Sequence, residues 1–270
     1  MLTLVPTPIG NIADISLRAM DALRDADILL CEDTRVTKKL LHILQERYNL
    51  ERKEQEFISL HSHNEQAFIE KITPSFFESN VVYVSDAGMP GISDPGQLLV
   101  HYCQEEHIAY DVLPGANALL TAFVASGFMN TQMLFFGFLP HKGKDRAQAL
   151  QGALHNGFTT VLYEAPHRLD KLLKELSHEV PERKIFCAKE LTKKYQRYFH
   201  GQAADVLEKI SNSAIKGEWV VVIEAGESRD SSLSENDVLE LDLPKKSAAK
   251  LISKITGENT KACYQRLLDI

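Results

Sequence analysis

The chain has 270 residues, of which 44 % are hydrophobic and 25 % charged; this is the balance of a folded globular protein, and the length suits two medium domains or one large one. Its 30 basic and 37 acidic residues give a net charge of −7 at pH 7, which by itself argues against a long polyanion as partner. It lacks an apolar run of about 18 residues and a basic N-terminal leader, and its four cysteines lie far apart. We therefore expect a reduced, cytoplasmic protein without membrane span, signal peptide, disulfide or zinc cluster.

Short apolar and β-branched runs predict strands along most of the chain. In chain order they cover residues 2–6, 27–31, 57–60, 81–85, 108–112, 134–138, 159–163, 184–188 and 218–224. Segments with helical spacing separate them, as at Leu17, Met20 and Leu23 after the candidate cap Ser16. Strands joined by single helices are typical of α/β folds, so we expect largely parallel sheets.

Breaks in this pattern and in charge divide the chain into four parts. We predict an N-terminal domain at 1–130, a C-terminal domain at 131–227, an acidic linker at 228–243 and a basic tail at 244–270. The linker carries one Arg and five acidic residues, and the tail carries six basic and two acidic residues. Apolar residues at helical spacing on both sides of Gly257 indicate two short tail helices resembling a helix-turn-helix piece.

Segments rich in Gly and Pro follow four of the predicted strands. They are residues 5–11, 85–96, 113–118 and 163–168. Ligands of open α/β sheets bind beyond the carboxyl ends of the strands, and glycine lets the backbone approach a ligand closely. Such loops often contain Gly and Pro without a ligand, but four of them at one edge predict a binding site.

The usual nucleotide-binding fingerprints are missing. The chain has no GxxxxGK[ST] sequence and no GxGxxG after a strand, which argues against a P-loop and a Rossmann site. Asp86, Asp94 and Glu164 lie in or beside the loops. These carboxylates either favour a cationic ligand or cap helices and bridge loops.

Eight segments resemble motifs of one family. They are VPTPIGN (5–11), CEDTRVT (31–37), LHSHNE (60–65), SDAGMPGISDPG (85–96), GFLPHKGKDR (137–146), YEAPHRL (163–169), KELTKKY (189–195) and GEWVVVIEA (217–225). In this order they resemble the ribosomal RNA small subunit methyltransferase I family, part of the tetrapyrrole-methylase fold group. The first motif, the second with the third, and the fourth are together specific to it.

The resemblance implies two αβα domains with a ligand cleft between them, usually in a homodimer. It implies S-adenosyl-L-methionine as cofactor and 2′-O-methylation of a cytidine ribose in 16S rRNA of the small ribosomal subunit. The positions that match the family's cofactor site are Pro8, Gly10, Asp86, Gly88, Pro90, Ile92, Ser93, Asn117, Tyr163, Ala165 and Glu218.

A ribose hydroxyl is a weak nucleophile, so we expect a nearby base. We favour four residues for catalysis: Glu32, Glu65 and Glu164 as candidate bases, and Arg35 as a phosphate contact because a guanidinium matches phosphate geometry. Asp33, His63 and His167 remain alternatives for the base. Glu32 to Arg35 could instead form a helix cap with an ion pair, and Glu65 could merely start a helix.

Two basic segments are candidate RNA contacts. The first contains Lys142, Lys144 and Arg146 in a strand-to-helix loop; the second contains Lys193, Lys194 and Arg197 with tyrosines between them, which suits stacking on unpaired bases. A solvated basic loop is the alternative for the first. We expect no metal, because no ligand cluster stands out beyond His61 and His63.

The sequence is thus identified as a member of an RNA-methylating family, and two alternatives stay open. A methylase of a small tetrapyrrole would share the fold and cofactor but would have no use for the basic segments. A non-catalytic S-adenosylmethionine-binding or RNA-chaperone module would bind without turnover.

Overall fold

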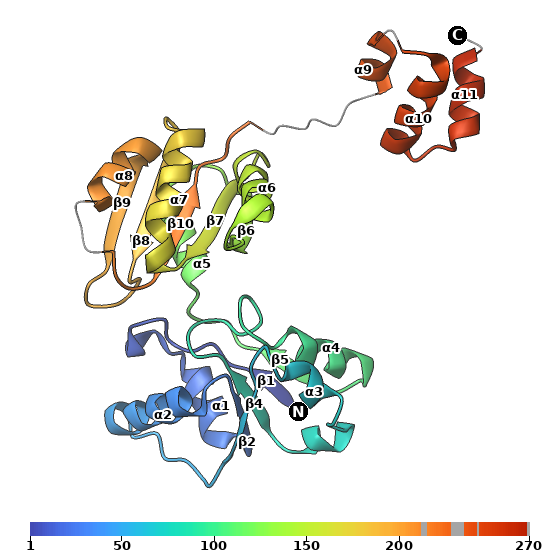
Figure 1. The fold of residues 1–270 in the computed structure, drawn as a ribbon. Coiled ribbons are helices and arrows are strands. Elements are labelled where there is room, and N and C mark those ends of the chain that lie inside the picture. The colour runs from blue at the N-terminus through green and yellow to red at the C-terminus, as the bar shows by residue number, and fades with distance from the viewer. Residues whose placement is uncertain (212–214, 228–234, 242, 269–270) are drawn as a thin grey trace. The chain divides into compact units, whose positions relative to one another are not determined.

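The computed structural model describes residues 1–211, 215–227, 235–241 and 243–268. By contacts the chain divides into a larger unit of residues 1–154 and 158–226 and a smaller one of residues 155–157 and 227–270. Most of the predicted acidic linker, residues 228–234 and 242, lies outside the described residues. Figure 1 shows the elements of both units.

The first sheet of the larger unit has five parallel strands, as the sequence predicts. They are β1 (Leu2–Leu4), β2 (Ile28–Cys31), β3 (Glu56–Ser59), β4 (Val81–Val84) and β5 (Tyr110–Val112), in the order β3-β2-β4-β1-β5. Between them run α1 (Leu17–Asp25), α2 (Thr34–Tyr48), α3 (Glu65–Ile69) and α4 (Gln97–Glu105), with short 3-10 turns at Ile12–Asp14 and Pro74–Glu78.

Alternating side chains of these strands fill two cores, one on each face of the sheet. Leu29 and Cys31 of β2 join a cluster with α1 and α2, whereas Leu30 joins a cluster with Leu99 of α4. Both faces are therefore covered, which explains the almost unbroken apolar sequence of β2. Ser16 caps α1 as predicted, since its hydroxyl accepts a hydrogen bond from the Ala19 N–H (3.1 Å).

The second sheet has the strand order β6-β7-β10-β8-β9 and is mixed. Its strands are β6 (Met133–Phe138), β7 (Thr159–Glu164), β8 (Lys184–Lys189), β9 (Arg197–Gln202) and β10 (Trp219–Ile223). Only β6 and β7 pair in parallel, while β10 is antiparallel to both neighbours and β9 is antiparallel to β8. The expectation of a largely parallel sheet is wrong here.

The physical reason is a hairpin that the sequence analysis missed. The backbone turns between β8 and β9 with Glu190 and Thr192 at positive φ (51° and 62°). β9 is an edge strand with mostly exposed, polar side chains, so it lacks the apolar run by which the other strands were predicted.

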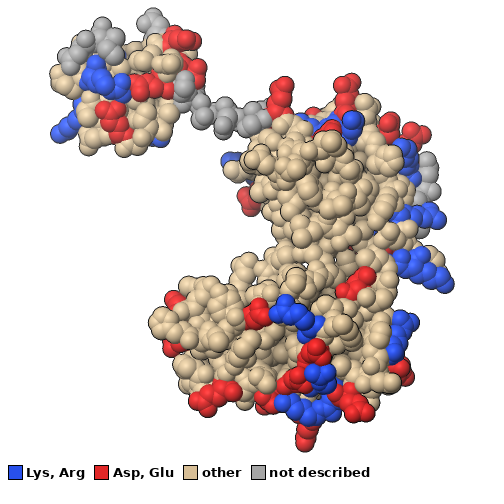
Figure 2. Space-filling model, turned by 180° about the vertical axis from the view of Figure 1, so that it is seen from behind, with Lys and Arg blue, Asp and Glu red and all other residues tan. Residues whose placement is uncertain are grey.

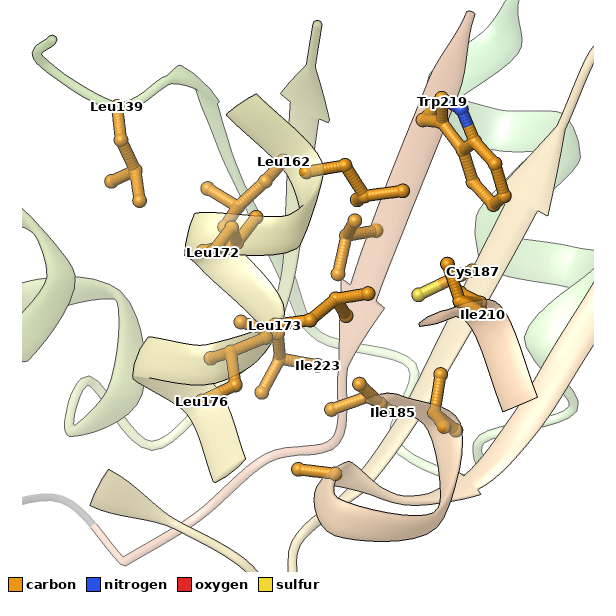
Figure 3. Close-up of a cluster of buried hydrophobic side chains, with 14 of the residues drawn as sticks. Leu139, Leu162, Leu172, Leu173, Leu176, Ile185, Cys187, Ile210, Trp219 and Ile223 are labelled. Carbon is orange, nitrogen blue, oxygen red and sulfur yellow. The ribbon is translucent and has the colours of Figure 1, made fainter. Parts of the chain in front are cut away.

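Helices also cover both faces of the second sheet. Its main core (Figure 3) packs α6 (Gly143–Leu154), α7 (Pro166–Glu179) and α8 (Ala203–Ser211) against residues that include Leu162 and Trp219. On the other face Leu119 and Ala122 of α5 (Ala118–Ser126) pack against β8 and β10. The predicted boundary near residue 130 places α5 with the first sheet, but its packing joins it to the second.

The smaller unit contains α9 (Glu235–Glu240), α10 (Lys245–Thr256) and α11 (Thr260–Leu268). They share a core of their own that includes Val238, Ala249, Ile252 and Cys263. Gly257 ends α10 in the left-handed conformation (φ 76°), so the predicted helical tail is confirmed. Within the part of the chain that the structure describes, none of the helices has the length and apolarity needed to cross a membrane.

Candidate active site

The larger unit contains a pocket of about 390 Å³ at the carboxyl ends of β4 and β7. This volume lies within the usual range of small-molecule sites. Loops that the sequence analysis singled out supply much of the lining. The lining residues are Ile9, Ala87, Gly88, Met89, Ile92, Ser93, Asp94, Asn117, Ala118, Phe138, Tyr163, Glu164, Ala165, Pro166, Ala188, Leu191, Glu218, Trp219 and Val220.

The loops after β1 and β4 are tied together beside the pocket. Thr7 and Gly88 exchange two backbone hydrogen bonds of 2.9 and 3.0 Å. Gly88 has a φ of +90°, and a Cβ there would lie 3.2 Å from Cγ2 of Ile9. The close contact therefore needs glycine for its conformation and for its small size.

Most of the predicted cofactor-binding residues line this pocket. They are Gly88, Ile92, Ser93, Asn117, Tyr163, Ala165 and Glu218, whereas Pro8, Gly10, Asp86 and Pro90 do not line it. Asn117 also caps α5, because its Oδ1 accepts a hydrogen bond from the Leu120 N–H (3.0 Å). A Cβ on Gly10 would collide with the side chains of Lys193 and Thr192, which makes Gly10 a packing residue of the neighbouring loop.

Glu164 alone of the four predicted catalytic residues lines the pocket. It is 2 % exposed at the end of β7. Its Oε1 lies 3.1 Å from Nε of Arg168, and its Oε2 lies 3.7 Å from Nη1 of Arg146 without a hydrogen-bond partner. Two guanidinium groups thus lie close enough to balance the charge of this carboxylate.

The other three predicted catalytic residues have partners outside the pocket. Glu65 is buried and accepts a hydrogen bond from the Gly96 N–H (2.8 Å), so it fixes the loop after β4. Glu32 accepts from the Asp86 N–H (3.1 Å). Arg35 is largely exposed and pairs with Asp33 (2.6 Å), which caps α2. This pairing holds the pKa of Asp33 down at about 2.

Asp94 is a pocket carboxylate that the site prediction did not include. Burial raises its pKa to about 6, and the charges of Glu32 and Asp86 add to this effect. The same combination of burial and the Glu32 charge raises the pKa of Asp86. Asp94 belongs to the SDAG…ISDPG motif, and its place in that motif is the sequence signal by which it could have been included. A carboxyl group that titrates near neutrality is suited to accept a proton.

Arg146 is a correction to the predicted RNA contacts. It is 2 % exposed on the inner side of α6. Its guanidinium binds both carboxylate oxygens of Glu175 (2.7 and 3.0 Å) and donates to the Pro140 carbonyl (3.1 Å). Arg146 therefore holds α6, α7 and the loop before α6 together, and its buried guanidinium is not available to bind an RNA phosphate.

The remaining basic residues differ in their freedom to bind RNA. Lys142, Lys144, Lys194 and Arg197 are exposed, but Lys193 pairs with Glu190 (3.1 Å) and Glu218 (2.9 Å). Basic and acidic side chains are interspersed on the face drawn in Figure 2. Among the described residues, no group of three or more His, Cys, Asp or Glu side chains is arranged to hold a metal ion.

Comparison with known proteins assigns this chain to a family. The model of the tetrapyrrole (corrin/porphyrin) methylases matches residues 1–207. Solved structures of this fold include diphthine synthase (TM-score 0.61, 13 % identity, 83 % of this chain and 89 % of that one). They also include uroporphyrin-III C-methyltransferase from Thermus thermophilus complexed with S-adenosyl homocysteine (TM-score 0.52, 16 % identity, 82 % and 96 %). At such identities the likeness confirms the predicted fold.

Sequence relatives are much nearer. A protein of Campylobacter fetus named ribosomal RNA small subunit methyltransferase I is 47 % identical over 99 % of this chain and 100 % of its own length. Its namesake in Helicobacter pylori (strain ATCC 700392 / 26695) is 46 % identical over 100 % and 99 %. The chain therefore belongs to the tetrapyrrole methylases and, within them, to the ribosomal RNA small subunit methyltransferase I family, as its sequence motifs predict.

Proposed function

We propose that this protein transfers a methyl group from S-adenosylmethionine to the 2′-hydroxyl of a cytidine in 16S rRNA. Family membership supports methyl transfer to ribosomal RNA. The observation that carries the proposal is the pocket at the strand ends, which the family's own motifs line. Its position follows the general rule for ligands of α/β sheets.

The pocket's chemistry fits this cofactor, a nucleoside whose sulfur carries a positive charge and whose adenine ring presents flat apolar faces. Three carboxylates line it, those of Asp94, Glu164 and Glu218. Glu164 Oε2 is buried without a hydrogen-bond donor, and apolar side chains such as Ile9 and Val220 complete the walls. We assign cofactor binding to the seven predicted residues that line the pocket, Gly88, Ile92, Ser93, Asn117, Tyr163, Ala165 and Glu218. Pro8, Gly10, Asp86 and Pro90 have a supporting role.

When bound, the sulfonium supplies an electrophilic methyl group that a nucleophile attacks from the side opposite the sulfur. The protein fixes this line of approach and excludes water, and such positioning alone can contribute about 7–11 kcal/mol. Asp94 is the proton acceptor that we propose for the ribose hydroxyl. With a pKa of about 6, its carboxylate is mostly deprotonated at pH 7 and is a stronger base than an ordinary aspartate.

Substrate RNA is much larger than the pocket, so the surface must contribute binding. Lys142, Lys144, Lys194, Arg197 and Arg35 are exposed cations that we assign to phosphate contacts. Arg35 must first exchange its ion pair with Asp33. Since that pair is on the surface and is screened by water, breaking it costs little.

We further propose that the protein acts in the cytoplasm as a homodimer. On the outer side of α5 and after it, Leu120 (50 % exposed), Val124 (77 %) and Met129 (94 %) present apolar surface to solvent. Leu120 and Val124 are one helical turn apart and share a face. We propose that a second copy of this chain covers this face. Sedimentation of the Val124→Glu variant tests this: the variant is expected to be a monomer, whereas a variant with the same molecular mass as the parent dimer would refute the assignment.

Labelled S-adenosylmethionine and small ribosomal subunits lacking this methylation test the proposed function. Label is expected in 16S rRNA, at a cytidine whose 3′ phosphodiester bond resists alkaline cleavage because its 2′-oxygen is methylated. Label on an added tetrapyrrole would instead identify a small-molecule methylase, and cofactor binding without any transfer would identify a non-catalytic module. Asp94→Asn should retain cofactor binding and lower kcat, by roughly 10²- to 10⁴-fold if Asp94 is the base.

A further inference from the structure

Strand β6 contains a β-bulge beside the pocket. Its register with β7 pairs Phe135 with Val161, then Gly137 with Leu162 and Phe138 with Tyr163. Phe136 and Gly137 together therefore lie opposite one residue of β7. Gly137 has a φ of +68°, a conformation that favours glycine. A bulge reverses the facing of every residue that follows it in the strand.

The facing of the β6 side chains shows this reversal. In a regular strand Phe136 and Phe138 would point to the same side. Here Phe136 and Leu139 both pack in the core cluster around Leu162 (Figure 3 labels Leu139 and Leu162). Phe138 instead contacts the ring of Tyr163 and lines the pocket. Without the extra residue, Phe138 would lie on the face of the sheet opposite the pocket.

Phe138 lines the pocket and yet is 53 % exposed. Its ring meets the Tyr163 ring edge-to-face, with 5.7 Å between centroids and 65° between planes. Tyr163 is braced in turn by Phe135 at 5.0 Å. A half-exposed aromatic ring buries little apolar surface and so contributes little to stability. Its position at the pocket therefore indicates contact with a bound ligand.

The backbone that follows Phe138 is firmly anchored. The Leu139 carbonyl accepts a hydrogen bond from Nη2 of Arg168, and the Pro140 carbonyl accepts one from Nη1 of Arg146 (3.1 Å). Both guanidinium groups also lie within 4 Å of Glu164. The backbone next to the ring is thus held in place by these contacts. The exposed Lys142 and Lys144 follow a few residues later.

We propose that Phe138 is the stacking platform for the unpaired nucleobase of the substrate nucleotide. This inference rests on the proposed function, because it requires an RNA substrate. A nucleotide whose ribose enters a pocket must leave its base stack, which removes stacking partners that an aromatic ring replaces. The bulge is then the device that brings the ring to the pocket.

Steady-state methylation of small subunits by the full-length chain tests the proposal, with cofactor affinity measured separately by calorimetry. Phe138→Leu keeps an apolar side chain without a ring and is expected to lower kcat/KM for the subunit by roughly 5- to 150-fold, the range of one lost base–aromatic stack. Phe138→Trp should stay within about threefold of the parent, because it keeps a flat ring. Cofactor affinity should be unchanged in both. Tyr48→Leu, at an exposed ring that ends α2, is the matched control.

Several outcomes would overturn the assignment. Equal kcat/KM for Phe138→Leu and the parent would mean that the ring is not used. A fall in cofactor affinity with an unchanged KM for the subunit would assign the ring to the cofactor's adenine. If the parent protein itself fails to methylate the subunit, the proposed function has failed, and this result is distinct from the other two.

Discussion

Replacing Arg146 by alanine separates a structural role from RNA binding. The substitution removes the hydrogen bonds to Glu175 and to the Pro140 carbonyl. It also takes one of two guanidinium groups from the fully buried Glu164 carboxylate, which keeps Arg168 and the Ala165 N–H as partners. Breaking a buried ion pair by removing one partner costs about 3–5 kcal/mol. Because Glu164 keeps Arg168 and Glu175 is 25 % exposed to water, we expect the lower end, about 3 kcal/mol.

Urea unfolding followed by tryptophan fluorescence measures this loss. Trp219 is the one tryptophan of the chain and lies in the core on which α6 and α7 pack, so its signal reports the domain that contains Arg146. Arg146→Lys should fall between the parent and Arg146→Ala, since lysine keeps the charge but not the planar fork. Lys144→Ala, an exposed cation two residues earlier, should change stability by less than about 0.5 kcal/mol.

The opposite pattern would refute this reasoning. If Arg146→Ala unfolds within about 0.5 kcal/mol of the parent but binds RNA more weakly, Arg146 contacts phosphate and its burial is unimportant. A double-mutant cycle with Glu175→Gln adds a further check. Coupling of less than about 0.5 kcal/mol would show that the two side chains act independently.

Three further predictions concern the pocket and the tail. The pKa of Asp94 is raised to about 6 from 3.8, so the folded state binds a proton more tightly than the unfolded state, and stability falls as pH rises from about 4 to 6. Asp94→Asn should remove this part of the pH dependence, so that its stability relative to the parent is higher at pH 7 than at pH 4. The same pH dependence of unfolding in the variant and the parent would contradict this prediction. Gly88→Val adds a branched side chain at a φ of +90° that meets Ile9, and calorimetry should show at least about tenfold weaker cofactor binding; unchanged affinity in a folded variant would remove Gly88 from the site. Truncation after Gly226 should leave a folded protein that still binds cofactor, since α9 to α11 have their own core. Its affinity for the subunit should fall, with a shallower salt dependence, because six basic residues are lost: Lys245, Lys246, Lys250, Lys254, Lys261 and Arg266. An unchanged salt slope with a lower melting temperature would make the tail a stabilising element.

Local sequence by itself was enough for nine of the ten described strands, for the loops and for the family. Buried strands such as β2 and β10 are apolar without interruption, and the Gly/Pro segments after β1, β4 and β7 reach the pocket wall. Such signals depend on neighbours in the chain, which the sequence displays directly. The family motifs added the cofactor loop, and seven of the residues predicted from them line the pocket.

Partners distant in the chain decided the rest. Whether a charged side chain binds a ligand or holds the fold together depends on the groups that surround it. Only folding brings Glu175 to Arg146, Gly96 to Glu65 and Arg168 to Glu164. The direction of β10 follows from the β8–β9 hairpin, whose polar edge strand carries no apolar signal. The bulge at Gly137, in the FFGFLP segment at 135–140, was not predicted, although an isolated glycine in a strand can indicate one. It determines which face of the sheet receives Phe138. Register and burial are tertiary properties because they depend on pairing across the sheet, and local composition does not encode that pairing.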